Sequence, residues 1–117
     1  MMSQERRREL RDSYERAARR AGVYGIRNRA TGRMLIASTR DLDSMRNRFD
    51  FGILTGSVSA MDGRLAADAR QYGIIIFEFV ELDELASAPD ADQKQVDDDL
   101  AQLEELWRAK LEGAPVY

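Results

Sequence analysis

The spacing of hydrophobic positions changes several times along the chain, and each change predicts a new structural element. Over the first 20 residues, apolar side chains recur at helical spacing on a narrow stripe between many arginines, with Ser3 in position to cap the helix. We therefore expect a basic amphipathic helix that ends at Gly22. Residues 23–28 and 34–37 are short, mostly apolar runs joined by a turn segment that ends in Gly32, which predicts a β-hairpin.

The rest of the chain returns to helical spacing and then changes again. Asp41 can cap a helix with an apolar face over residues 42–53, and a second helix is expected over residues 61–72. Residues 74–82 are rich in β-branched and aromatic side chains and predict a third strand. After an acidic, proline-containing connection, apolar positions between residues 96 and 111 form one stripe of a last helix. The order α-β-β-α-α-β-α predicts an α+β fold built on a small, three-stranded, mainly antiparallel sheet flanked by helices.

Length and composition limit the chemistry that the chain can perform. Its 117 residues suit a single domain over residues 1–117, with a basic helix over 1–21 and a core over 22–117. The absence of cysteine and histidine excludes disulfides, thiol nucleophiles, Ser-His-Asp chemistry and the usual zinc sites. The longest apolar stretch has only the length of a strand and the N-terminus is highly charged, so we expect a cytoplasmic protein without a membrane partner. Catalysis would depend on Asp, Glu, Tyr, Arg and Lys side chains.

Charge is distributed unevenly along the chain. Residues 1–48 carry 13 Arg or Lys and 6 Asp or Glu, a net charge of +7, whereas residues 49–117 carry 5 and 15, a net charge of −10. A basic half is typical of a phosphate binder, and 16 of the 18 cations are arginine, which suits bidentate contacts with phosphate. The same distribution also suits self-association or binding of an acidic protein partner through the basic helix, and both interpretations stay open.

The last predicted helix carries one carboxylate in an unexpected position. At about 100° per residue, Glu104 falls on the same stripe as Leu100, Trp107 and Leu111. A carboxylate on an apolar stripe needs a compensating cation or hydrogen-bond donors, because desolvation of the charge is costly. Two explanations fit this position: an ion pair with an arginine, or binding of a divalent cation such as Mg²⁺.

Several short segments, taken together, resemble the GIY-YIG nuclease superfamily. The segment Gly22–Tyr24, followed after ten residues by Leu35–Ala37, resembles the two tripeptides that give the family its name. Residues 41–48 resemble the helix that follows in the family, residues 71–79 the last helix-to-strand passage, and residues 103–107 the metal-binding helix. The resemblance covers nearly the whole chain, and the N-terminal helix is similar to that of small stand-alone bacterial members.

This resemblance implies a domain that hydrolyses phosphodiesters in nucleic acid. By position, Tyr24 corresponds to a tyrosine that helps to activate water, and Arg48 or its neighbour Arg46 to an arginine that contacts the scissile phosphate. Glu104 corresponds to the glutamate that binds one Mg²⁺. If active, the chain would therefore be a Mg²⁺-dependent endonuclease, a chemistry that requires neither histidine nor cysteine.

Four of the chain's departures from the family pattern fall in the predicted hairpin and the helix after it. Leu35 stands where the family commonly has a second tyrosine, and Ala37 replaces the closing glycine of the second tripeptide. Met45 and Phe49 stand where the family often has an arginine and a histidine, so we interpret both as core residues. We therefore expect a divergent member whose phosphodiester hydrolysis is weak or lost.

Two further hypotheses need no catalysis. The fold suits a catalytically silent module that binds DNA or RNA through the basic half, and it also suits a protein-interaction module. In either case Tyr24 is a half-buried strand residue, Arg46 and Arg48 lie on a solvated helix face, and Glu104 is an ion-pair partner. Where nucleic acid binds, we expect contacts from three arginines of the basic half: Arg27, Arg33 and Arg40.

Overall fold

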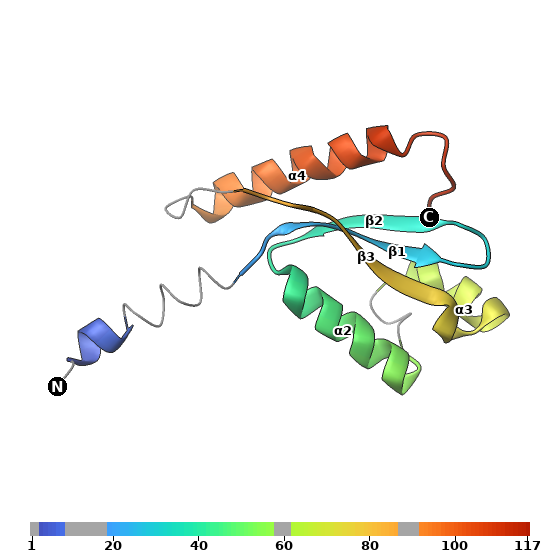
Figure 1. Cartoon of the computed structure of the whole chain (residues 1–117), viewed down its shortest axis with the longest axis horizontal. Coiled ribbons are helices and arrows are strands. Elements are labelled where there is room, and N and C mark those ends of the chain that lie inside the picture. Colours follow the sequence, from blue (N-terminus) through green and yellow to red (C-terminus); the bar gives the residue numbers. More distant parts are fainter. Residues whose placement is uncertain (1–2, 9–18, 58–61, 87–91) are drawn as a thin grey trace.

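A three-stranded antiparallel sheet forms the centre of the fold (Figure 1). The structure, a computed structural model, describes residues 3–8, 19–57, 62–86 and 92–117. The central strand, β1 (Gly22–Asn28), pairs antiparallel with β2 (Met34–Thr39) on one side and with β3 (Phe77–Glu84) on the other. The predicted hairpin and the predicted antiparallel sheet are therefore confirmed.

Helices cover both faces of this sheet. α2 (Leu42–Thr55) and α3 (Ala66–Tyr72) lie on one face, and α4 (Gln93–Lys110) lies on the other (Figure 1). Two single-turn 3₁₀ helices, η2 (Gly63–Leu65) and η3 (Ile74–Ile76), flank α3. This arrangement confirms the predicted α+β class. Within the described residues, no helix combines the length and the apolar character that a membrane span requires.

Alternate side chains of β1 supply two separate hydrophobic cores, because successive strand residues point to opposite faces of a sheet. Val23 is fully buried in the core against which Trp107 of α4 packs. Tyr24 and Ile26 lie in the other core, together with Leu65 of η2 and residues of α2. The strand therefore places Tyr24 on the α2 side of the sheet.

The two residues predicted to cap helices, Asp41 and Ser3, both do so in the structure. The Asp41 carboxylate accepts a hydrogen bond from the Ser44 amide at 3.1 Å and caps α2. The Ser3 hydroxyl likewise accepts from the Arg6 amide at 3.2 Å, at the start of a helical turn over residues 4–8. Both predicted N-caps are confirmed, because a short polar side chain at this position satisfies an amide that the helix leaves unpaired.

Three predicted boundaries need correction. The helix expected over residues 61–72 is an α-helix only from Ala66, because residues 63–65 form η2, and residue 61 lies outside the described residues. Residues 19–21 are not helical, so the basic helix does not extend to Gly22, and residues 9–18 of that prediction lie outside the described residues. The third strand begins at Phe77 rather than at residue 74, because residues 74–76 form η3. The Arg29 guanidinium donates to the carbonyls of Ile75 and Ile76, which occupies acceptors that a strand would need for pairing.

A buried polar cluster ties the hairpin to α3 and to the C-terminal residue. Asn28 is fully buried, and its side-chain amide donates to Asp68 at 3.0 Å and to the Tyr117 hydroxyl at 3.1 Å, while its carbonyl oxygen accepts from the Ala30 amide. The Tyr117 hydroxyl also donates to Asp68. The Tyr117 backbone amide donates to the Met34 carbonyl at 3.2 Å, so the tail lies along β2. Each buried polar atom here has a partner, as burial requires.

Stability is expected to fall in acid partly through Asp68. The pKa of Asp68 lies below its usual 3.8. The hydrogen bond from Tyr117 is the largest cause, followed by the hydrogen bond from Asn28 and the positive charge of Arg33. A carboxyl with a lowered folded pKa stabilises the fold above its unfolded pKa, and that stabilisation is lost as pH falls through the folded pKa. Circular dichroism should therefore show that Asp68→Asn, although less stable at pH 7, loses less stability than wild type between about pH 5 and pH 3. Equal losses would show that Asp68 does not contribute.

Candidate active site

The candidate site is organised around the Tyr24 phenol. Tyr24 is only 7% exposed, and its ring stacks on Phe79 of β3 with centroids 5.1 Å apart and 11° between the planes. Phe49 of α2 contacts the same Phe79 ring at 5.8 Å. The phenol is therefore more buried than the predicted half-buried strand residue. Neighbours from two elements fix its ring.

Four charged side chains from other parts of the chain act on the Tyr24 hydroxyl. Burial is the main cause that raises the pKa of Tyr24; the negative charges of Asp62 and Glu104 raise it further, and the positive charges of Arg48 and Arg64 lower it. These residues come from α2, η2, the residue before η2 and α4. The fold thus brings Tyr24, Arg48 and Glu104 into one electrostatic neighbourhood, although they are far apart in sequence.

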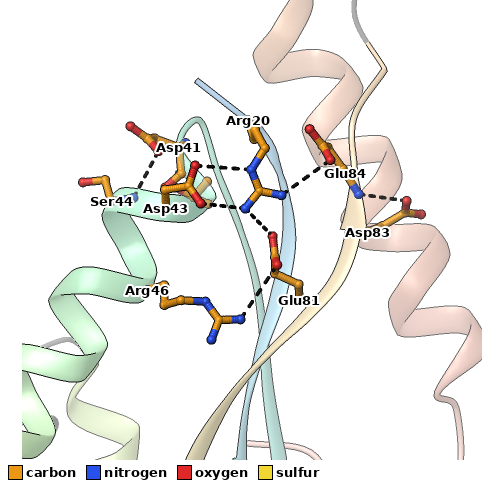
Figure 2. A network of polar contacts seen from close by, with 9 residues as sticks. Arg20, Asp41, Asp43, Ser44, Arg46, Glu81, Asp83 and Glu84 are labelled. Carbon is orange, nitrogen blue, oxygen red and sulfur yellow. Dashed lines mark hydrogen bonds and ion pairs between the residues drawn. The ribbon is translucent and has the colours of Figure 1, made fainter. Parts of the chain in front are cut away.

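Arg46 and Arg48 face different parts of the molecule. Two residues correspond to about 200° around a helix, so neighbours with this spacing point in nearly opposite directions. The Arg46 guanidinium lies 4.9 Å from the centre of the Phe79 ring of β3. It also lies 3.8 Å from a Glu81 oxygen of the same strand, and Figure 2 shows the two side chains facing each other. Arg48 instead acts on Tyr24. Of the two candidate arginines, Arg46 contacts the Phe79 ring that stacks on Tyr24, whereas the charge of Arg48 is the one that lowers the pKa of the phenol.

Arg20 organises the charged residues beside Arg46 and has a structural role (Figure 2). Its guanidinium contacts Asp43 at 2.6 Å and Glu81 at 2.8 Å, and a third oxygen, from Glu84, lies at 3.5 Å. These contacts raise the pKa of Arg20, with the Asp43 hydrogen bond as the largest cause. Arg20 therefore joins the first turn of α2 to β3 and offsets part of the negative charge of these three carboxylates.

Glu104 is only partly exposed and is already paired. Its side chain is 26% exposed, and one carboxylate oxygen lies 3.5 Å from Nε of Arg108, one helical turn further along α4. Arg108 also donates to the Ile36 carbonyl of β2 at 2.8 Å. The ion-pair explanation for Glu104 is confirmed, but the partner comes from the same helix and not from the basic half.

The donor set at Glu104 does not fit a bound metal ion. Among the described residues, no three or more Asp, Glu, His or Cys side chains are grouped so that they could hold one. A magnesium site can rely on one carboxylate and several waters, but that carboxylate must be free to face the cation. The carboxylate of Glu104 faces a guanidinium instead. The Mg²⁺ that the family resemblance implies is therefore not supported by the residues in place.

The four departures from the family pattern are all apolar packing residues. Leu35 and Phe49 are 2% and 4% exposed and belong to the same core as Tyr24. Met45 and Ala37 are partly buried and pack against that core. The interpretation of Met45 and Phe49 as core residues is confirmed. None of the four has a polar group with which to donate or accept a proton.

The three arginines predicted to contact nucleic acid are each engaged by a carboxylate of a different element. These partners lie on β3, α3 and α4. A phosphate would have to compete with a carboxylate at each of them, which weakens their attraction for nucleic acid. The pairs are Arg27 with Glu78 at 3.1 Å, Arg33 with Asp68 at 3.6 Å, and Arg40 with Asp97 at 2.6 Å.

Three residues that bear on the site were not predicted from the sequence: Asp62, Arg64 and Arg108. The Asp62 carboxylate accepts from Nε of Arg64 at 3.0 Å and from its terminal nitrogen at 2.6 Å, which fixes the guanidinium. Leu65, fully buried in the Tyr24 core, anchors this turn. Two features of the sequence could have indicated these residues. Asp62 is an acidic N-cap two residues before Arg64, and Arg108 follows Glu104 after four residues, about one helical turn.

Comparison with known proteins identifies relatives only at the level of solved structures. No protein-family model matches the chain, and no curated protein matches it. The catalytic domain of the homing endonuclease I-TevI matches with a TM-score of 0.54 and 21% identity, over 78% of this chain and 87% of that chain. A mutant of the catalytic domain of this intron endonuclease matches with a TM-score of 0.55 and 20% identity, over 79% of this chain and 84% of that chain. The fold is GIY-YIG-like. The predicted GIY-YIG resemblance is therefore confirmed for the architecture.

The environment of Tyr24 in this GIY-YIG-like fold predicts a phenol that stays protonated at neutral pH. Its raised pKa means that tyrosinate forms only above the usual value of 10.0. Ultraviolet titration of wild type and Tyr24→Phe should give a difference curve that rises later than the curve of free tyrosine. A difference curve with a midpoint below pH 10 would mean that Arg48 and Arg64 outweigh burial.

Proposed function

We propose that the chain is a nuclease-like protein that binds nucleic acid at the Tyr24 site and hydrolyses phosphodiesters weakly or not at all. The observation that carries this proposal is that the charges of Arg48, Arg64 and Glu104 all act on the pKa of the Tyr24 phenol within a GIY-YIG-like fold. Three of these four residues are the ones that the family resemblance selects. Fold alone does not determine function, so the proposal depends on this site.

The two arginines suit contacts with a phosphodiester. A guanidinium presents several N–H donors in a planar fork, and its hydrogen bonds to an anion are stronger than neutral ones. Asp62 orients Arg64 through two side-chain hydrogen bonds, so a phosphate would have to share this guanidinium with a carboxylate, as it would at Arg27, Arg33 and Arg40. Arg48, on α2, contributes a positive charge that lowers the pKa of the same phenol. A phosphate placed between Arg48 and Arg64 would be within the field of both cations.

Tyr24 is suited to donate a hydrogen bond and is poorly suited to act as a strong base. Burial keeps its pKa raised, so the phenol carries its proton at neutral pH. A neutral hydroxyl can donate to a phosphate oxygen or orient a water molecule. Stacking on Phe79 holds the ring in place, so little side-chain freedom is lost when a ligand binds.

The same site lacks groups that efficient hydrolysis needs. A general acid or base must lie within hydrogen-bond reach of the proton that it transfers. Leu35 and Phe49, at positions where the family commonly has tyrosine and often histidine, are apolar and buried. Glu104 faces Arg108 and is charge-balanced. These features support a site that binds a phosphodiester better than it cleaves one.

Binding and cleavage assays test this function against the protein-interaction alternative. Fluorescence anisotropy with labelled single- and double-stranded DNA and RNA should show binding that weakens as salt rises, because phosphate contacts release counterions. Incubation of the same probes with Mg²⁺ or Mn²⁺ should give slow cleavage or none, and any cleavage should disappear in Glu104→Ala. Failure to bind all four probes at low ionic strength would contradict the proposal and favour protein interaction or self-association. Rapid cleavage that depends on Glu104 would contradict the weak activity.

A further inference from the structure

Arg108 bridges Glu104 to the edge of the sheet. Its terminal nitrogen donates to the carbonyl of Ile36 at 2.8 Å, and its Nε lies 3.5 Å from the Glu104 carboxylate. Ile36 belongs to β2, an outer strand, and is only 2% exposed. The terminal nitrogen of the guanidinium is thus hydrogen-bonded to a buried backbone oxygen, while its Nε faces the Glu104 carboxylate.

Packing of α4 on the sheet holds the backbone of Arg108 in place, while its side chain is 43% exposed. Leu103 and Trp107 pack α4 against the core beneath it, and the Trp107 indole donates to Asp83 of β3 at 3.0 Å. The helix therefore has a fixed rotation relative to β2. With α4 and Ile36 both fixed, the positive charge of Arg108 stays beside Glu104, in contrast to a long side chain that moves freely in solvent.

A divalent cation bound to Glu104 would lie close to the positive charge of Arg108. Mg²⁺ binds a carboxylate oxygen at about 2.1 Å, so a cation on the paired oxygen would lie within about 6 Å of the guanidinium nitrogen. Like charges at that distance repel each other appreciably even in a high dielectric. We propose that Arg108 holds the Glu104 carboxylate in place of a divalent cation, so that the nuclease-like site has a guanidinium built into the chain where a metal would otherwise bind. This inference rests on the proposed function for the role of Glu104.

Metal binding by Arg108 variants tests this inference without any measurement of activity. Isothermal titration with Mn²⁺ should show that Arg108→Gln and Arg108→Met bind about tenfold more tightly than wild type, because one like charge near the carboxylate is removed. The gain should disappear when Glu104→Gln is combined with either variant. Lys110→Gln is the matched control: it removes a cation that lies over the Trp107 ring, at 4.6 Å from its centre, and should leave Mn²⁺ affinity unchanged.

Three results would overturn the inference. They are an Arg108 variant that binds Mn²⁺ no more tightly than wild type, an equal gain in Lys110→Gln, and a gain that persists without the Glu104 carboxylate. If loss of the Ile36 contact unfolds the variants, paramagnetic broadening by Mn²⁺ in wild type decides the question. We expect no selective broadening of the Glu104 amide at micromolar Mn²⁺, and such broadening would overturn the inference. Nucleic-acid binding by the same wild-type protein is measured separately, so failure of this inference is distinguishable from failure of the proposed function.

Discussion

Gly22→Ala should lower the free energy of unfolding by about 2–3 kcal/mol, an effect of the size expected when a close-packed site is overfilled. A Cβ at Gly22 would lie 2.2 Å from the Asp83 carbonyl oxygen and 2.7 Å from a methyl carbon of Leu42. The oxygen belongs to the backbone of β3, next to the irregular register between Val23 and Tyr24. The strand would have to move, because a backbone atom cannot rotate away as a flexible side chain can. Urea unfolding followed by circular dichroism measures the loss.

Gly63→Ala is the matched control for this prediction. A Cβ at Gly63 would have no atom of the described residues within 4 Å, so the same substitution there should change stability by less than about 1 kcal/mol. Equal effects at the two glycines would contradict the steric explanation. The predicted result would show that Gly22, the first residue of the Gly22–Tyr24 tripeptide, is required for close packing of β1 against β3, independently of catalysis.

Arg48→Met should raise the Kd for nucleic acid by roughly tenfold to a hundredfold, since a charge-assisted hydrogen bond to phosphate contributes about 1.5–3 kcal/mol. Methionine keeps most of the aliphatic side chain and removes the charge. The dependence of affinity on salt should also become shallower by about one phosphate contact. Fluorescence anisotropy at several salt concentrations measures both effects on one labelled oligonucleotide.

Arg46→Met provides the control for Arg48→Met, because it removes the same charge from the same helix two residues away. Arg46 lies over Phe79 and beside Glu81, away from Arg48, so its loss should weaken binding by less than about threefold. Thermal unfolding of both variants must show that each stays folded at the assay temperature. Equal weakening by the two substitutions would mean that nucleic acid senses only the overall charge of α2.

Elements fixed by local chemistry were predictable from the sequence. Asp41 and Ser3 cap helices through contacts with amides three residues away, so the signal and its effect lie in one short segment. The third strand was predicted to start too early because Ile74–Ile76 have side chains typical of strands. The hydrogen bonds from Arg29 that occupy carbonyls of this turn come from a residue far away in sequence.

The candidate site was predictable only in part, because some of its contacts join residues that are far apart in sequence. The family resemblance selected Tyr24, Arg48 and Glu104, which the fold brings into one neighbourhood. Arg64 reaches this neighbourhood because Leu65 is buried in the Tyr24 core, a tertiary contact that sequence spacing does not encode. Arg108 was partly predictable, because four residues along a helix place it beside Glu104. Its contact with the Ile36 carbonyl depends on how α4 lies on the sheet.

The most direct test of the central claim is to map the nucleic-acid contact by nuclear magnetic resonance. Titration of a short single-stranded oligonucleotide into labelled protein should shift signals of Tyr24, Arg48, Arg64 and Glu104 together, with a common dissociation constant. Shifts confined to Arg27, Arg33 and Arg40, with none around Tyr24, would contradict the claim that these four residues form one phosphodiester-binding site.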